Sequence, residues 1–150
     1  MEIREYYSLT EHEQAAMRDA IGKAEWSGAT LLEAWLENGM LPEKCGAGIR
    51  LLLGVEGECL ASFLTLAPRD DVDSPLTPWI GFVYTFPAFR GQRRAGALIE
   101  HACTLAKDEG YTRVYVSTNA MGLYERYGFE FLCQDTDVWG GETRVYVRTL

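Results

Sequence analysis

The sequence predicts a single α/β (α+β) domain whose sheet combines parallel and antiparallel strands. Residues 79–110 have the pattern of a strand, a turn and a helix, and another strand pattern follows at residues 112–117. Such a strand, helix and strand unit requires parallel neighbours joined by a right-handed crossover. Two further pairs of strand patterns, each joined by a glycine-containing turn, indicate antiparallel hairpins. A chain of 150 residues is long enough to bury the core of one domain.

The N-terminal third predicts one strand and two helices. Residues 3–7 have the pattern of an edge strand, and Thr10 with Glu13 forms a capping box at the start of a helix that runs to about Lys23. Apolar side chains recur at helical spacing over residues 30–37, which predicts a second helix. The glycines and Pro42 in residues 39–48 predict a loop.

Residues 49–55 and 59–66 predict two strands that turn at Glu56 and Gly57. A polar stretch with three aspartates follows at residues 68–75. Its carboxylates could attract an ammonium group or help to deprotonate it. Its composition favours the alternative, a solvated loop before a strand, and both interpretations stay open here.

The next strand, residues 79–85, leads into a helix that ends at Gly110. The segment between them contains Arg90, Arg93 and Arg94, although the chain is acidic overall. A helix N-terminus has unpaired N–H groups, and Gly91 and Gly96 allow a ligand to approach the backbone closely. This combination suits a phosphate or pyrophosphate. The alternative is a solvated basic helix start that pairs with surface carboxylates.

The two common phosphate loops do not fit this segment. A Walker A loop ends in Gly-Lys-Ser/Thr, but Ala97 and Leu98 follow Gly96. A dinucleotide fingerprint has three glycines, and here two glycines lie five residues apart. The segment resembles the pyrophosphate loop of the GNAT superfamily of N-acetyltransferases, Gln/Arg-x-x-Gly-x-Gly/Ala. Arg90 matches the first position and Ala95 the last, whereas Arg93 replaces the middle glycine.

A second stretch supports the same resemblance. Residues 119–129 predict a short helix that ends at Gly128, and they are similar to the GNAT signature Asn-(variable)-Leu-Tyr-Glu-Lys-x-Gly-Phe. Residues 129–138 and 143–149 then predict the final hairpin, around Gly140 and Gly141. The resemblance covers the chain in order. It implies one GNAT-type N-acetyltransferase domain over residues 1–150, with a mostly antiparallel sheet, a central parallel strand pair and about four helices.

The resemblance also implies a function. Acetyl-CoA would be the cosubstrate, and a primary amine of a small molecule or peptide would attack its thioester directly. Tyr124 would donate a proton to the departing thiolate. A bulge in the strand at residues 83–85 would direct an N–H group at the thioester carbonyl. The residues implied in cofactor binding are Val83, Tyr84, Thr85, Arg90, Gly91, Gln92, Arg93, Arg94, Ala95, Gly96 and Asn119.

The acceptor is less well defined. In GNAT proteins the paired helices near the N-terminus form one wall of the acceptor groove, which makes Trp26 and Glu33 candidates for substrate contact, together with Trp35 and Glu37. For Trp35 the helical spacing favours a place in the core. The group that takes the amine proton stays open between Glu33, Asp71 and a water held by Tyr84.

Composition narrows the partners. With 14 Lys and Arg against 22 Asp and Glu, the net charge of −8 argues against nucleic acid and favours an amine-bearing small molecule. The four cysteines are scattered without metal-ligand spacing, so we expect no metal and no disulfide, but buried thiols in a reducing compartment. We find no signal peptide and no apolar run of roughly 18 residues, and we expect a cytoplasmic protein without membrane contact. Whether the final hairpin pairs in a homodimer stays open.

Two other functions compete with catalysis. A non-catalytic sensor on the same fold would bind acyl-CoA or CoA without transferring the acyl group. An unrelated α/β protein could use its arginines to bind a phosphorylated metabolite, and it would show no preference for CoA over other phosphates.

Overall fold

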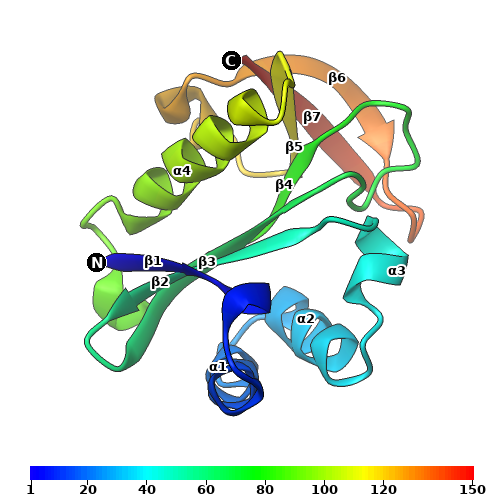
Figure 1. Ribbon diagram of the computed structural model, residues 1–150. Coiled ribbons are helices and arrows are strands. Elements are labelled where there is room, and N and C mark those ends of the chain that lie inside the picture. The colour runs from blue at the N-terminus through cyan, green and yellow to red at the C-terminus, as the bar shows by residue number, and fades with distance from the viewer.

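A seven-stranded mixed sheet forms the centre of the computed structural model, which describes residues 1–150 (Figure 1). The strand order is β1-β2-β3-β4-β5-β7-β6. Only β4 and β5 pair in parallel, and all other neighbours are antiparallel. This confirms the predicted mixed sheet with a central parallel pair. The strands are β1 (Glu2–Glu5), β2 (Arg50–Glu56), β3 (Cys59–Ala67), β4 (Trp79–Thr85), β5 (Arg113–Thr118), β6 (Glu130–Thr136) and β7 (Glu142–Thr149).

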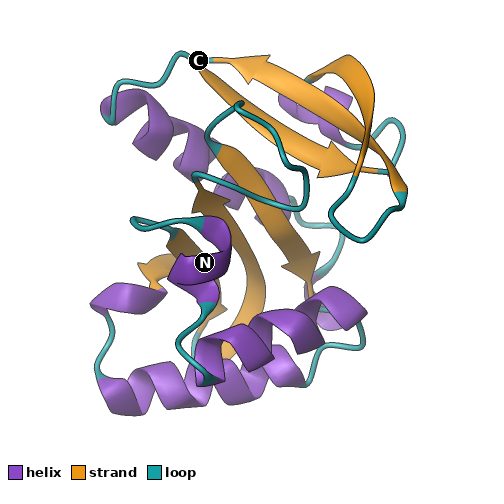
Figure 2. Ribbon diagram, turned by 90° about the vertical axis from the view of Figure 1, so that its right-hand side faces the viewer, coloured by secondary structure: helices purple, strands orange, loops and turns teal.

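Four α-helices cover the two faces of the sheet. The longest, α4 (Arg94–Asp108), packs on one face, and α1 (Glu11–Gly22), α2 (Ser27–Glu37) and α3 (Leu41–Cys45) lie on the other (Figures 1 and 2). The side chains of β2 alternate between two cores: Leu51 and Leu53 pack with α1 and α2, and Leu52 packs with α4. No helix combines the length and the apolarity that crossing a membrane requires.

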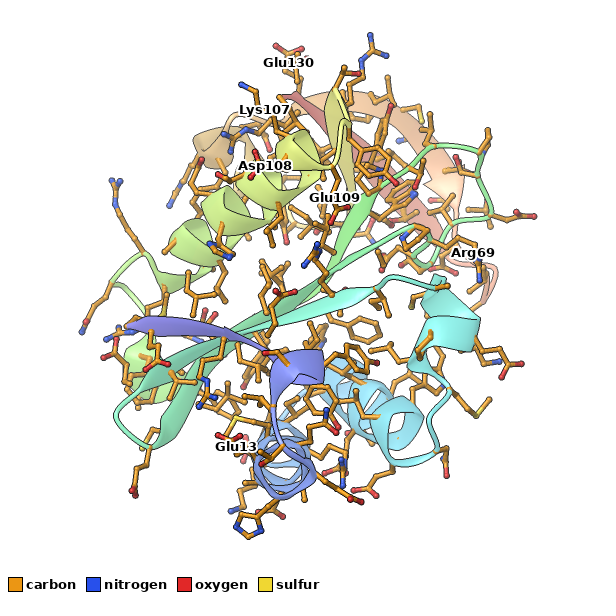
Figure 3. The ribbon with its side chains drawn as sticks, in the orientation of Figure 1. Glu13, Arg69, Lys107, Asp108, Glu109 and Glu130 are labelled. Atoms are coloured by element: carbon orange, nitrogen blue, oxygen red, sulfur yellow. The ribbon has the colours of Figure 1, made fainter.

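The predicted capping box at the start of α1 is present. The Glu13 N–H donates to Thr10 Oγ1 at 3.2 Å, and the Thr10 N–H donates to Glu13 Oε1 at 3.0 Å. Figure 3 labels Glu13 there, and it labels Glu109 just beyond the C-terminal end of α4. Arg50 of β2 donates to Glu109 Oε1 at 2.8 Å, which ties that end of α4 to the sheet.

Three local predictions are wrong. The first strand ends at Glu5, because the chain turns into a 3-10 helix (Tyr6–Ser8) that buries Tyr6. The loop expected at residues 39–48 contains α3, because Pro42 lies in its first turn, where a missing N–H costs no helical hydrogen bond. The four cysteines are free, but only Cys45 and Cys103 are buried, whereas Cys59 is exposed beside the β2–β3 turn and Cys133 is half-buried.

The parallel pair holds over a short distance only. Trp79 and Ile80 of β4 pair with Tyr115 and Val116 of β5, and the two strands then separate. A register shift between β3 and β4 marks a β-bulge there, and Phe82 has a φ of 51°. The space between β4 and β5 beyond Ile80 and Val116 is called the strand opening below.

Candidate active site

A cavity of about 710 Å³ lies at the strand opening. The helices α2 and α3 bound it on one side, and the turn between β6 and β7 bounds it on the other. The helical side contributes Trp26, Ser27, Gly28, Leu31, Trp35, Lys44 and Cys45. The strands contribute Gly81, Phe82, Val83, Val116, Ser117 and Thr118. Asp70, Asp71, Tyr124, Val138 and Trp139 complete the lining.

The arginine segment (residues 90–96) joins β4 to α4 and offers a row of free backbone donors. The N–H groups of residues 91–96 donate no hydrogen bond within the protein, whereas the Ala97 N–H donates to Arg93 O at 3.0 Å. Arg93 is the residue before the first turn of α4 and has a left-handed backbone, with φ 58° and ψ 27°. Arg93 therefore holds the conformation that glycine adopts most easily, at the position where the predicted motif has glycine.

The three arginines of this segment differ in their contacts. Arg90 Nε donates to Thr85 O at 2.9 Å, and its guanidinium lies 5.5 Å from the centre of the Tyr84 ring. Arg94 is held by Glu56 Oε1 at 3.0 Å and by a carbonyl oxygen at 3.0 Å. Arg93 is exposed and forms no ion pair or hydrogen bond. Arg93 is thus the arginine whose charge is available to an anion.

Tyr124 begins the 3-10 helix Tyr124–Tyr127, which ends at Gly128 as predicted. Its side chain is 5% exposed and packs edge-on against Phe129, yet its hydroxyl makes no hydrogen bond within the protein. Burial, and then the nearby Asp70, raise the pKa of the phenol well above its usual range. The group therefore stays protonated in a part of the cavity where a proton donor has no competing partner.

The aspartate loop (residues 68–78) places two carboxylates in the cavity. The Asp70 carboxylate lies over Gly81, where a Cβ atom would collide with Asp70 Oδ1. Burial, reinforced by Asp71, raises the pKa of Asp70 to about 8, and burial also raises the pKa of Asp71. Neither carboxylate forms an ion pair. Asp71 Oδ1 and the buried Thr65 Oγ1 have no hydrogen-bond partner.

This loop is only partly solvated: Arg69, Asp73 and Pro75 are exposed, whereas Asp70 and Asp71 line the cavity, so the second interpretation of the acidic stretch is wrong for these two aspartates. The Val138 N–H donates to Asp71 O at 2.7 Å, and Val72, which is buried, forms a bridge with Asp137. These bonds attach the loop to the β6–β7 turn and turn its carboxylates inward. No group of three or more His, Cys, Asp or Glu side chains is arranged to hold a metal ion.

The structure brings together only some of the residues proposed for the acceptor. Trp26 and Asp71 line the cavity. Trp35 both lines the cavity and packs against the core. Glu33 does not reach the cavity, because its carboxylate lies against Gly22 of α1. Glu37 instead pairs with an arginine of α1 at 3.2 Å.

The residues proposed for the cofactor also divide. Val83 lines the cavity, but the Tyr84 ring stacks on Trp26 at 5.6 Å on the face covered by α1 and α2. Tyr84 is therefore poorly placed to hold a water at the cavity. Thr85 Oγ1 lies 2.9 Å from a serine hydroxyl of β3. The Asn119 amide donates to the Glu142 carbonyl at 3.1 Å and is absent from the cavity lining. Gln92 is exposed, and Ala95 and Gly96 lie in the first turn of α4.

Most of the lining residues were missed, and Asp70, Phe82 and Trp139 differ in the signal that could have found them. Asp70 lies beside the predicted Asp71, and the run of aspartates was the only signal for it. Phe82 was included in the predicted strand, but no local pattern marks its left-handed conformation. Trp139, which is 65% exposed, lies in a turn far along the chain, and only the tertiary structure brings it to the cavity.

Comparison with known proteins gives a consistent result. A structure of a GNAT family acetyltransferase from Elizabethkingia anophelis with acetyl-CoA bound is 16% identical, with a TM-score of 0.66 over 99% of this chain and 97% of that chain. An aminoglycoside 6'-N-acetyltransferase complexed with coenzyme A is 12% identical, with a TM-score of 0.70 over 99% and 97%. A ribosomal-protein-alanine N-acetyltransferase from Brucella melitensis is 16% identical, with a TM-score of 0.66 over the full length of both chains.

These likenesses show the fold. No curated protein sequence matches the chain significantly. The model of the Acetyltransferase (GNAT) family matches residues 7–129, which is most of the chain. The protein is therefore a member of the GNAT family of acetyltransferases.

Proposed function

We propose that this chain transfers an acetyl group from acetyl-CoA to a primary amine of a small molecule or peptide. The observation that carries the proposal is the strand opening. Its β4 edge is unpaired beyond Ile80, the arginine segment with its free N–H groups follows β4, and Tyr124 lines the adjoining cavity. The complexes of similar structures with CoA and acetyl-CoA support this use of the fold.

The residues present fit the cosubstrate. The free N–H groups of residues 91–96 lie where the positive end of the α4 dipole favours a pyrophosphate, and Arg93 adds an unpaired positive charge. The Phe86 N–H donates to Ala61 of β3, so backbone alternation directs the Thr85 N–H away from β3. That edge of β4 would pair with the amide groups of the pantetheine arm, as an added strand does.

The chain supplies two groups for the reaction itself. Backbone N–H groups at the β4 bulge would stabilise the negative charge that develops on the thioester oxygen. Tyr124 would donate its proton to the departing sulfur. A thiol titrates near 8.5 and a phenol near 10 in water, so this transfer becomes useful where the thiolate forms away from solvent.

The proposal includes the cytoplasm as the place of action. All four cysteines are free, and two of them are buried among apolar side chains, as is usual in a reducing compartment. It also treats residues 1–150 as one catalytic domain, because all strands belong to one sheet.

Substitution of one hydroxyl tests the function. We expect Tyr124→Phe to lower kcat for amine-dependent thiol release by about 10²-fold or more, because the thiolate loses its proton donor. The dissociation constant of CoA should stay unchanged. Tyr127→Phe is the matched control, since Tyr127 lies in the same 3-10 helix but outside the cavity lining.

The measurements are thiol release from acetyl-CoA with a panel of amines, and calorimetric titration with CoA. If the protein bound CoA but released no thiol with any amine, the results would favour the non-catalytic sensor over the enzyme. If the protein bound inorganic phosphate as tightly as it binds CoA, the result would contradict both the enzyme and the sensor.

A further inference from the structure

We infer that the acceptor is a small monoamine with an apolar, ring-sized body, and that Asp70 and Asp71 bind its ammonium group and Asp70 receives its proton. This inference rests on the proposed acetyl transfer and specifies the acceptor for it. Three observations carry it: two carboxylates without cationic partners, unsatisfied polar atoms beside them, and a wall of aromatic rings.

The carboxylates lie where the reaction would occur. Asp70 packs over Gly81, the first residue of β4 after its last pair with β5. A carboxylate at this point faces the start of the strand opening, one residue before Phe82 and the bulge. Asp70 is also close enough to Tyr124 for its charge to be felt there. The proposed proton acceptor and proton donor therefore border the same space.

The polar atoms around the two carboxylates are incompletely satisfied. Thr65 is 1% exposed, and its Oγ1 has no hydrogen-bond partner. This atom lies 3.2 Å from the point that a Cβ on Gly81 would occupy, which is also against Asp70 Oδ1. Asp71 Oδ1 is equally unpartnered. Buried polar atoms rarely remain unpaired, and an ammonium group, with three donors, would satisfy such a set of acceptors.

The aromatic wall describes the rest of the acceptor. The centre of the Phe82 ring lies 6.4 Å from that of Trp26 and 6.0 Å from that of Trp35, and both pairs are edge-on. Trp139 approaches from the β6–β7 turn and is 65% exposed. Such rings favour an apolar body next to the ammonium group.

The charge of the lining limits the acceptor to one cation. The lining contains two aspartates and one basic residue, Lys44. The Lys44 ammonium lies 6.0 Å from the centre of the Trp35 ring. A second ammonium on the acceptor would have to leave water beside aromatic rings and Lys44, without a carboxylate to receive it. The charged and titratable groups around Asp70 and Asp71 are Lys44, Cys45, Arg69, Tyr124 and Asp137.

The protons balance with solvent as the final acceptor of one of them. The amine nitrogen forms a bond to the acetyl carbon while the carbon–sulfur bond breaks. The bound ammonium loses two protons in all: the first leaves to solvent before the attack, which frees the nitrogen lone pair, and the second passes to ionised Asp70 as the new bond forms. Tyr124 supplies the proton that the sulfur gains. Protonation of Asp70 removes the negative charge that holds the Tyr124 proton in place, so proton uptake at one residue assists proton release at the other. Return of the Asp70 proton to Tyr124, through solvent, restores both groups.

The experiment compares 2-phenylethylamine with 1,4-diaminobutane and a lysine-containing peptide. We expect kcat/KM for 2-phenylethylamine to exceed that of the diamine by about tenfold or more, because of the second ammonium. Asp70→Asn should lower kcat/KM for 2-phenylethylamine by about 10²-fold and weaken its binding to the CoA complex in calorimetry. Asp73→Asn, exposed on the same loop, should change neither quantity.

A second variant distinguishes an effect on the acceptor site from a loss of protein stability. Trp139→Ala alters an exposed side chain, and it should reduce kcat/KM for 2-phenylethylamine more than for the diamine. Faster turnover of the diamine or the peptide would overturn the monoamine inference and leave acetyl transfer intact. Turnover unchanged in Asp70→Asn would overturn the role of that carboxylate. Absence of both turnover and binding with every amine would overturn acetyl transfer as well.

Discussion

The two segments that flank β4 hold opposite charges in opposite ways. The aspartate loop precedes the strand and turns its carboxylates into the cavity, where they have no cationic partner. The arginine segment follows the strand and holds Arg93 in solvent, beside N–H groups that no protein atom accepts. One strand therefore separates a buried acidic site from an exposed basic one.

The difference lies in the energy that each charge contributes. An exposed arginine is screened by salt and contributes little on its own, so the row of backbone donors must provide most of an anion site. A carboxylate removed from water interacts strongly with any cation that reaches it. As long as no cation is bound, the buried charge destabilises the folded protein. The basic side of β4 should therefore tolerate side-chain substitution, and the acidic side should not.

The largest expected effect comes from adding one methyl group on the acidic side. Gly81→Ala would place a Cβ against Asp70 Oδ1 and within 3.2 Å of Thr65 Oγ1. The carboxylate must move, so we expect kcat to fall by about 10²-fold and the free energy of unfolding to fall by about 1–3 kcal/mol. Steady-state kinetics and urea denaturation measure the two effects.

A double substitution shows whether this methyl group acts through Asp70. If it does, Gly81→Ala should cause little further loss of kcat in a protein that already carries Asp70→Asn. Losses that multiply would contradict the close packing of Asp70 on Gly81 as the cause.

A smaller effect concerns stability against pH. The pKa of Asp70 is raised in the folded protein, so the folded state holds this proton more tightly than the unfolded state does. The contribution of Asp70 to the free energy of unfolding is fully present below pH 4, declines as the pH rises and is lost above about pH 8. We expect the free energy of unfolding of Asp70→Asn to rise relative to that of the unsubstituted protein as the pH increases from 4 to 8.

Denaturant unfolding at a series of pH values measures this gain, with Asp73→Asn as the control. The charged and titratable groups around Asp70 are Lys44, Cys45, Arg69, Asp71 and Tyr124. A stability difference that does not change with pH would mean that Asp70 is ionised in the folded protein at every pH tested.

The same contrast explains what the sequence could predict. The arginine segment is contiguous, and its proposed function depends on a strand, a helix start and two glycines that are local features. Its location was therefore predictable, even with Arg93 in place of glycine. The division of labour among Arg90, Arg93 and Arg94 was not, because Glu56 holds Arg94 from another strand.

The cavity proposed for the acceptor could not be assembled from local patterns. Its lining comes from α2, α3, the aspartate loop and the β6–β7 turn, which are distant in the chain. Asp70 and Asp71 are adjacent and chemically alike, and their orientation depends on the space over Gly81 and the bond from Val138. Glu33 was a plausible candidate by its position on α2, but its side chain turns to Gly22. Side-chain direction here is set by tertiary contacts.

The smallest expected effect lies on the basic side, at Arg93. Arg93→Ala and Arg93→Gly both remove the guanidinium, but only glycine relieves the left-handed backbone. We expect the glycine variant to be more stable than the alanine variant, with a free energy of unfolding that is higher by about 1 kcal/mol. Both should weaken CoA binding by less than about tenfold at low salt, and by less still at high salt. Calorimetric titration at two salt concentrations measures this. A larger loss that persists at high salt would assign the anion site to the Arg93 side chain, and the backbone donors of residues 91–96 would then be secondary.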